Sequence, residues 1–307
     1  MSVEILRKIP LLLATAAAVA VLTFLLIHLA PGDALDAYLG QEGASSSEKT
    51  LIREKLGLDK PVYVRFARYA ERLAKGDLGS IPGKGPVAAI IKRRFIATAR
   101  LALAAILISV TVGVSMGLAA GWHAGTAFDR WAQVALVFLV STPIFWFGLV
   151  VLLIFAWGLN LLPAAGSGGL AHLVLPALTL GLRPAALIAR VARANCIEAR
   201  SELFIIAARA RGLSWPAIVF KHILKVISIP IVTIVGMDFA SLLSGAVITE
   251  TVFSYQGLGQ FAVEAISNRW YDAVMAVALV WAALFVGANF IVDVSYAALD
   301  PRTRSTP

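Results

Sequence analysis

The sequence predicts an all-α integral membrane protein with six transmembrane helices, and three observations carry this prediction. Of the 307 residues, 59% are hydrophobic and 15% are charged, whereas soluble domains average roughly 45–50% apolar and about 25% charged residues. The mean hydropathy is +0.83. Several segments of about 20 residues contain few or no charges, and a helix needs about that length to cross the bilayer.

Six predicted spans follow one another along the chain. The first comes after Arg7 and Lys8, as in a secretory signal, but its apolar run is longer than that of a signal and Pro31 disfavours cleavage, so we expect a retained span. An outer-membrane barrel is disfavoured because its alternating ten-residue strands are missing from the sequence. The spans cover residues 9–30, 99–122, 131–159, 170–193, 226–249 and 273–298.

Basic residues predict that both termini lie inside the cell. Lys and Arg concentrate in the inner segments, whereas the short outer loops contain only Arg269. The triplet 92–94 lies on the outer side, and we discount it because loops longer than roughly 60 residues cross the membrane largely regardless of their charge. We assign the net charge of +9 to this bias and expect a lipid bilayer, not nucleic acid, as the partner. The basic inner segments are 7–8, 130, 190–225 and 302–304.

The chain divides into two predicted regions. Residues 1–95 contain the first span and a long outer loop, and residues 96–307 contain a five-helix core with a cytoplasmic loop at about 195–225. Within the outer loop, residues 61–75 predict an amphipathic helix with an apolar stripe and a basic stripe. Such a helix suits a lipid interface or the docking of a partner protein, and both remain open. The apolar stripe comprises Val62, Phe66, Tyr69 and Leu73.

Polar side chains in the predicted spans are functional candidates, because each is costly in hydrocarbon unless it faces protein or water. The fourth span holds Arg183 between Pro176 and Pro184, so we expect it to face protein or a cavity rather than lipid. A role in a solute pathway and a role in interhelical pairing are both open for these residues. The candidates are Arg183, Asp238, Glu250, Asn289 and Asp293.

The segment between the fourth and fifth spans predicts a helix, a turn and a second helix on the cytoplasmic side. Residues 201–211 form the first helix, and Gly212 tolerates the left-handed conformation at its end. Ser214 is placed to cap the next helix, with Pro216 in its first turn. An interfacial loop that only obeys the charge rule is the alternative.

Several stretches of the chain form a series of motifs in a fixed order. The loop reads Ala207-Ala208-Arg209-Ala210-Arg211-Gly212-Leu213, followed by Lys221-His222-Ile223-Leu224 and Pro230. Other stretches are Leu29-Ala30-Pro31-Gly32-Asp33, Gly76-Asp77-Leu78-Gly79, Leu175-Pro176-Ala177-Leu178-Thr179-Leu180-Gly181, Thr249-Glu250-Thr251-Val252-Phe253 and Ala298-Leu299-Asp300-Pro301-Arg302. Together they resemble the permeases of ABC importers, in the dipeptide/oligopeptide/nickel branch, over almost the whole chain.

The resemblance implies the type I ABC importer permease fold and a set of partners. A second, non-identical permease subunit would complete the pathway, two cytoplasmic ATPase subunits would dock on the inner loops, and an extracytoplasmic binding protein would deliver the solute. ATP and Mg²⁺ would be bound by the ATPase subunits, so this chain would be neither an enzyme nor the holder of a cofactor. The resemblance makes residues 207–213 the ATPase-coupling loop and places the chain in the bacterial inner membrane.

Two stretches depart from the family pattern. Ile206 stands where the general permease motif has an acidic residue, so a contact that needs that carboxylate is absent. In the outer loop, residues 80–86 are shorter and richer in glycine than the usual family stretch.

The resemblance predicts uptake of peptides or a related small solute, with nickel, glutathione or glycan uptake by the same machinery as alternatives. The four His residues are scattered and Cys196 is a single cysteine, so no metal site is expected. A stand-alone secondary transporter is a less favoured alternative. An intramembrane hydrolase would use Ser115 in Gly113-x-Ser115-x-Gly117, but we expect these glycines to serve helix packing.

Overall fold

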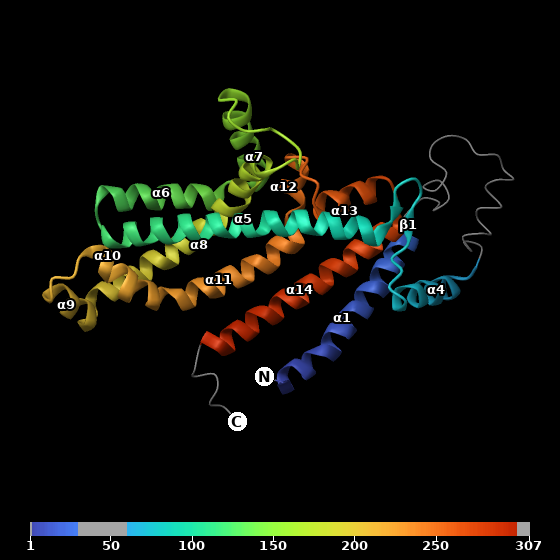
Figure 1. Ribbon diagram of the computed structural model, residues 1–307, viewed down its shortest axis with the longest axis horizontal. Coiled ribbons are helices and arrows are strands. Elements are labelled where there is room, and N and C mark those ends of the chain that lie inside the picture. Colours follow the sequence, from blue (N-terminus) through green and yellow to red (C-terminus); the bar gives the residue numbers. More distant parts are fainter. Residues whose placement is uncertain (1, 30–59, 300–307) are drawn as a thin grey trace. The chain divides into compact units, whose positions relative to one another are not determined.

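The computed structural model describes the backbone of residues 2–29 and 60–299 and most of their side chains (Figure 1). The described chain is mostly helical, with one two-stranded antiparallel hairpin. It divides into two compact units, residues 1–97 with 256–286, and residues 98–255 with 287–307. The sequence-based division at residue 95 stays a prediction about segments along the chain, and the structure adds that residues 256–286 pack with the first segment.

The described part of the first unit contains three complete helices, a hairpin and parts of two long helices. The complete helices are α1 (Ser2–Leu29), α4 (Val62–Ala74) and α13 (Leu258–Ser267). The hairpin joins β1 (Ser80–Ile81) to β2 (Gly85–Pro86), and α14 (Tyr271–Leu299) begins in this unit. One cluster of buried side chains joins the hairpin to α13 and α14, through Ile81, Val87, Leu258, Phe261 and Ala276.

The amphipathic helix of the outer loop is α4, and its apolar face is occupied within the first unit. Phe66, Tyr69 and Leu73 pack against Ala20 and Phe24 of α1. Figure 1 shows α4 beside the end of α1. This packing covers three of the four residues of the apolar stripe, whereas Val62 at the start of α4 is 48% exposed.

One residue of the predicted outer triplet 92–94, Arg94, forms an ion pair in the first unit. Arg94 donates to Glu264, with 3.2 Å between Nη2 and Oε2, and to Gln260 at 3.1 Å. Lys84 of the hairpin turn pairs with the same Glu264 and lies 4.2 Å from the ring centroid of Trp270. These contacts give Lys84 and Arg94 a structural role.

The second unit is built around two long helices, α5 (Val87–Trp122) and α8 (Leu170–Ser201). Glycines let the two backbones approach closely: a Cβ at Gly113 would lie 2.7 Å from the carbonyl oxygen of Ala185, and one at Gly121 would lie 2.8 Å from that of Arg193. Small residues permit such close packing in lipid. The predicted packing role of the glycines at 113 and 117 is therefore confirmed.

Ser115 lies inside the continuous helix α5. Its hydroxyl is exposed and donates to the Thr111 carbonyl at 2.6 Å. A nucleophile elbow needs a strand, a sharp turn and a helix, and that geometry is absent here. The hydrolase hypothesis is wrong for this residue.

The predicted third span is not one straight helix. It consists of α6 (Ala127–Ser141), α7 (Ile144–Leu152) and the π-helical segment η1 (Leu153–Gly158), with a bend of 108° between the two halves. Pro143 restricts the residue before it to extended conformations, and Thr142 accordingly has φ −79° and ψ 130°. Hydropathy predicts that this segment is apolar, but it does not predict the bend of the helix.

The predicted fifth span is also broken. The predicted range, 226–249, covers most of α11 (Leu224–Gly245) and the start of the short helix α12 (Val247–Val252). It is preceded by α10 (Trp215–Ile218) and the π-helical η2 (Val219–Ile223). A bend of 56° separates Trp215–Ser228 from Pro230–Phe239, at a proline that cannot donate to the helix. By contrast, α8 stays continuous through Pro176 and Pro184 and buries much of its length in the second unit, as expected.

In the described residues, three helices are long and apolar enough to cross a membrane, or five if each bent pair is one span. They are Val87–Trp122, Leu170–Ser201 and Tyr271–Ala288. Part of α1, Ala14–Leu26, is a shorter apolar helix. The count of six spans stays a prediction.

Candidate functional site

The predicted helix–turn–helix follows α8 directly. Glu202 is extended, with φ −70° and ψ 140°, and separates α8 from α9 (Leu203–Ala210). Gly212 has φ +74°, and its N–H donates to the Arg209 carbonyl at 2.8 Å. Ser214 precedes α10 in an extended conformation but makes no capping hydrogen bond through its side chain. The helix is shorter than the predicted 201–211, and the turn lies where it was expected.

One face of α9 packs against other helices of the second unit. Ile205 and Ala208 are buried and belong to a cluster with Cys196 of α8, Ile218 of α10 and Ile223 of η2. The Leu213 N–H donates back to the Ala208 carbonyl at 3.2 Å. The segment 203–218 is therefore attached as a compact piece rather than as a loose loop.

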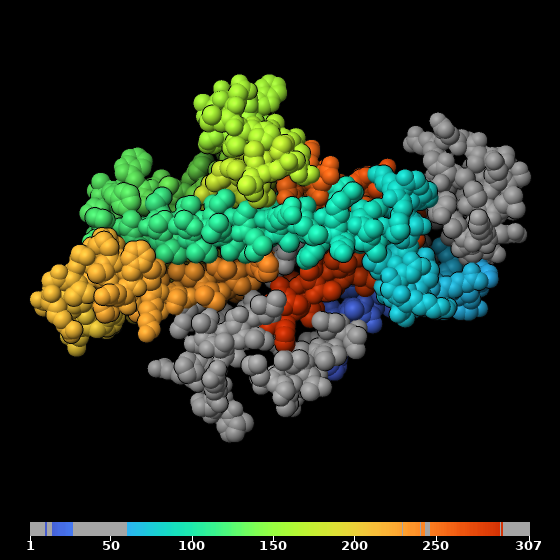
Figure 2. Space-filling model, in the orientation of Figure 1, coloured from blue at the N-terminus to red at the C-terminus, as the bar shows by residue number. Residues whose placement is uncertain are grey.

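The opposite face of α9 is apolar and exposed. The exposed fractions are 82% for Leu203, 52% for Ile206 and 72% for Phe220 nearby in η2. Arg209 and Arg211 are exposed in the same segment. Figure 2 shows α9 and α10 at the surface of the second unit. Exposed apolar side chains with cations in the same segment indicate a surface that another protein or a membrane covers.

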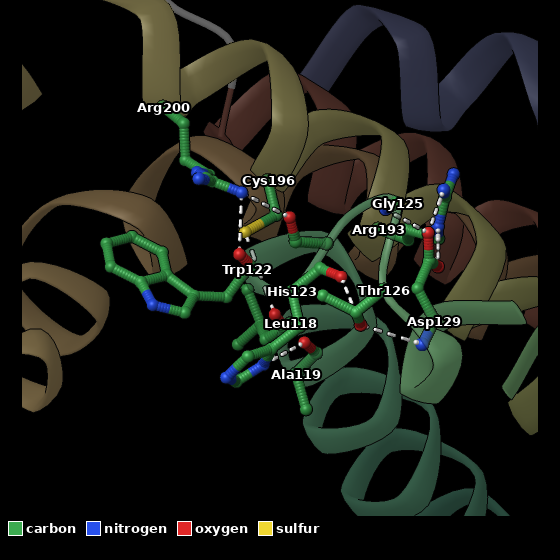
Figure 3. A network of polar contacts seen from close by, with 11 residues as sticks. Leu118, Ala119, Trp122, His123, Gly125, Thr126, Asp129, Arg193, Cys196 and Arg200 are labelled. Atoms are coloured by element: carbon green, nitrogen blue, oxygen red, sulfur yellow. Dashed lines mark hydrogen bonds and ion pairs between the residues drawn. The ribbon is translucent and has the colours of Figure 1, made fainter.

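Trp122, the last residue of α5, joins this segment to α5. Its ring stacks on Trp215 of α10, with 3.8 Å between the ring centroids. The guanidinium of Arg209 lies 4.5 Å from the Trp122 ring centroid and that of Arg200 lies 5.1 Å from it. Figure 3 shows Arg200 donating to the carbonyl oxygen of Trp122, at 2.6 Å.

The turn from α5 to α6 is fixed by an ion pair. Arg193 of α8 donates to both carboxylate oxygens of Asp129, at 2.6 and 2.7 Å (Figure 3). The hydroxyl of Thr126 accepts from the Asp129 N–H and caps α6. The sequence reasoning missed these residues; Thr126-x-x-Asp129 resembles a helix-start signature, whereas no sequence pattern indicates the Trp122–Trp215 contact.

The polar candidates within the spans are not brought together by the described structure. Arg183 is exposed on α8. Asp238 of α11 is half-buried, and its buried Oδ2 has no hydrogen-bond partner among the side chains that the structure describes. Glu250 of α12 is fully buried and accepts from the Thr98 hydroxyl at 2.6 Å. The side chains of Asn289 and Asp293 lie outside the described ones.

Within the part of the chain searched, no group of three or more His, Cys, Asp or Glu side chains is arranged to hold a metal ion. Cys196 is buried among the side chains that support α9.

Known proteins resemble the chain over nearly its whole length. Residues 109–305 match the family model described as binding-protein-dependent transport system inner membrane component. The chain is 37% identical over 313 residues to the probable peptide ABC transporter permease protein y4tP of Sinorhizobium fredii, covering 99% of this chain and 100% of that protein. It is 36% identical over 301 residues to the glutathione transport system permease protein GsiC of Salmonella paratyphi A, covering 98% of each.

Two further similarities concern a dipeptide permease and a solved structure. The chain is 31% identical over 332 residues to the dipeptide transport system permease protein DppB of Escherichia coli, covering 98% of each protein. A chain of the MetNI methionine ABC transporter, solved in inward-facing conformations, matches with a TM-score of 0.56 and 18% sequence identity. That match covers 69% of this chain and 97% of the other.

Proposed function

This chain belongs to the family of binding-protein-dependent transport system inner membrane components, and from that premise we propose that it imports peptides or a related small solute. It is the membrane-spanning permease subunit of an ABC importer and not an enzyme, and its fold is that of a type I importer permease. The relatives named for peptide, dipeptide and glutathione transport support a peptide-like solute. Nickel and glycans remain alternative solutes for the same machinery.

We propose that α9 and the turn after it couple this subunit to an ATPase. The observation that carries the proposal is the exposure of Leu203, Ile206 and Phe220 on a segment whose other face is buried. An ATPase subunit that covers this face would displace α9 and α10 together, because Ile205 and Ala208 of α9 share one buried cluster with Ile218 of α10. ATP and Mg²⁺ would be bound by that partner. The coupling loop comprises Ala207, Ala208, Arg209, Ala210, Arg211, Gly212 and Leu213.

The family implies ATPase and binding-protein partners in the inner membrane complex. We propose two ATPase subunits, a second permease that is not a copy of this one, and both termini on the cytoplasmic side. The concentration of cations at residues 190–225 supports this orientation.

Asp238 is the strongest candidate for the solute pathway. Its Oδ2 is buried and has no hydrogen-bond partner in the described part of the chain, and a carboxylate oxygen in a membrane helix needs a cation or donor. We propose that the solute or the second permease supplies it. Arg183, Glu250, Asn289 and Asp293 stay secondary candidates for the pathway or for pairs between helices.

The coupling proposal is tested by Leu203→Asp, which places a charge in the exposed apolar face. Leu170→Asp is the matched control, since Leu170 is 83% exposed and Leu203 is 82% exposed. We expect Leu203→Asp to lower co-purification of the ATPase by about tenfold or more, as truncation of interface anchors does, and to abolish ATP-dependent peptide uptake. Normal co-purification and uptake in Leu203→Asp would contradict the proposal.

A further inference from the structure

Trp122 contacts the coupling segment from the end of another helix. Its ring stacks on Trp215 of α10 at 3.8 Å between centroids, and Arg209 of α9 lies 4.5 Å from the ring centroid. One indole therefore contacts both helices of the segment that the ATPase is proposed to move. Stacking and cation–π contacts act at short range, so a displacement of α9 or α10 relative to α5 would weaken these contacts with Trp122.

The backbone of Trp122 is also fixed. Arg200 of α8 donates to the carbonyl oxygens of Gly121 and Trp122, at 3.1 and 2.6 Å (Figure 3). These are carbonyls at the carboxyl end of α5, where no further helical N–H is available to them. Trp122 is thus held at the end of α5 through both its ring and its backbone carbonyl.

The next residues along the chain connect this point to α6. The turn after Trp122 is closed by hydrogen bonds from the Gly125 N–H to Asp129, at 2.9 Å, and from the Thr126 hydroxyl to the His123 carbonyl, at 2.7 Å. Asp129 pairs with Arg193 of α8. Trp122 is accordingly linked to the start of α6 by a short, hydrogen-bonded turn.

We propose that Trp122 is a positioning residue that transmits displacement of α9 and α10 to α5 and α6. This inference rests on the proposed coupling function of α9. The rival route runs through the continuous chain, from α9 back into α8 and from α10 on into α11, and it makes the Trp122 ring dispensable.

The experiment uses the complete importer, reconstituted in liposomes with its ATPase subunits and solute-loaded binding protein, and measures solute molecules transported per ATP hydrolysed. We expect Trp122→Ala to lower this ratio by about tenfold, within the range of typical coupling between sites, while the ATPase still co-purifies. Trp122→Phe keeps a stacking ring and is expected to retain most of the ratio. Trp131→Ala is the matched control, since Trp131 of α6 is 73% exposed.

Arg209→Ala provides a second, milder variant, because Arg209 is exposed and its loss leaves the stacked rings in place. We expect the same direction of change, and we expect the double variant to be no worse than Trp122→Ala, since both changes interrupt one contact. A normal ratio in Trp122→Ala and Arg209→Ala would overturn the inference. Multiplied losses in the double variant would do so as well, provided that the ATPase co-purifies normally with Arg209→Ala, since Arg209 also belongs to the coupling loop.

The outcomes also separate this inference from the coupling proposal. If Leu203→Asp loses the ATPase but Trp122→Ala transports normally, coupling through α9 stands and transmission through Trp122 is wrong. If Trp122→Ala itself loses the ATPase, the ring shapes the docking surface and does not transmit movement, which also overturns the inference. If Leu203→Asp is normal, the coupling proposal fails first.

Discussion

Two short helices, α4 and α9, look alike in sequence and are used differently. Each combines apolar and basic residues outside the predicted spans, and each is followed by a left-handed glycine, Gly76 with φ +75° and Gly212 with φ +74°. The apolar face of α4 is buried against α1, with Tyr69 only 8% exposed, whereas Leu203 of α9 is 82% exposed. Amphipathicity therefore identifies an apolar helix face, and the tertiary packing shows whether other residues of the same chain bury that face.

The largest expected effect comes from placing proline at the two equivalent glycines. Proline fixes φ near −65°, and both N–H groups are used: that of Gly212 donates to the Arg209 carbonyl and that of Gly76 to the Leu73 carbonyl. We expect Gly212→Pro to reduce ATPase co-purification and peptide uptake to background. Gly76→Pro, the matched change, is expected to lower the melting temperature and leave co-purification intact. Equal effects on co-purification would remove the functional difference between the helices.

A second prediction concerns stability, for which a substitution in α4 is expected to have a larger effect than one in α9. The Phe66 ring packs edge-on against Phe24, with 5.2 Å between centroids, and removal of a largely buried aromatic side chain costs about 3 kcal/mol. We expect Phe66→Ala to destabilise the detergent-solubilised protein by about that amount in thermal unfolding, with ATPase co-purification unchanged. Leu203→Ala is expected to change stability by less than about 0.5 kcal/mol, as at other exposed sites. A large loss of stability in Leu203→Ala would mean that α9 is covered within the chain.

Much of this contrast could be predicted from the sequence, and the missing part is tertiary. Local patterns indicated a helix at 201–211, which the structure shows at 203–210, the turn at Gly212 and the close helix packing at Gly113, because propensity, backbone conformation and side-chain size act within a few residues. Pro143 was visible, but the 108° bend at that proline depends on packing that hydropathy does not contain. The Thr98–Glu250 hydrogen bond joins residues 152 positions apart, and no local signal predicts such a pair.

The candidate site shows the same division between local and distant information. The basic residues of the loop were evident in the sequence, but which of its residues are exposed was not. Leu203 and Ala208 are both apolar, and only the packing of Ala208 with α8 and α10 separates a supporting residue from a contact residue. Trp122 and Trp215 became neighbours only through the fold.

The smallest predicted effect tests how completely α4 is buried. Among the described residues, the buried Tyr69 hydroxyl has no hydrogen-bond partner, so Tyr69→Phe should leave stability at pH 7 unchanged or raise it by about 1 kcal/mol. Burial, with the nearby Asp272 carboxylate, raises the pKa of Tyr69 above its usual value of 10.0. The stability from keeping this phenol neutral is therefore present below pH about 10 and is lost as the pH rises through the raised pKa.

The measurement for Tyr69 is the melting temperature of the wild-type and Tyr69→Phe proteins between pH 8 and about 11.5, a range that brackets the usual tyrosine pKa. The wild-type protein should lose stability more steeply above pH about 10, because unfolding allows its Tyr69 to ionise freely whereas Phe cannot ionise. Tyr63→Phe is the control, since Tyr63 lies on α4 with 75% of its surface exposed. Parallel alkaline curves for the wild-type and Tyr69→Phe proteins would mean that solvent reaches this face of α4, and that its difference from α9 is smaller than the packing indicates.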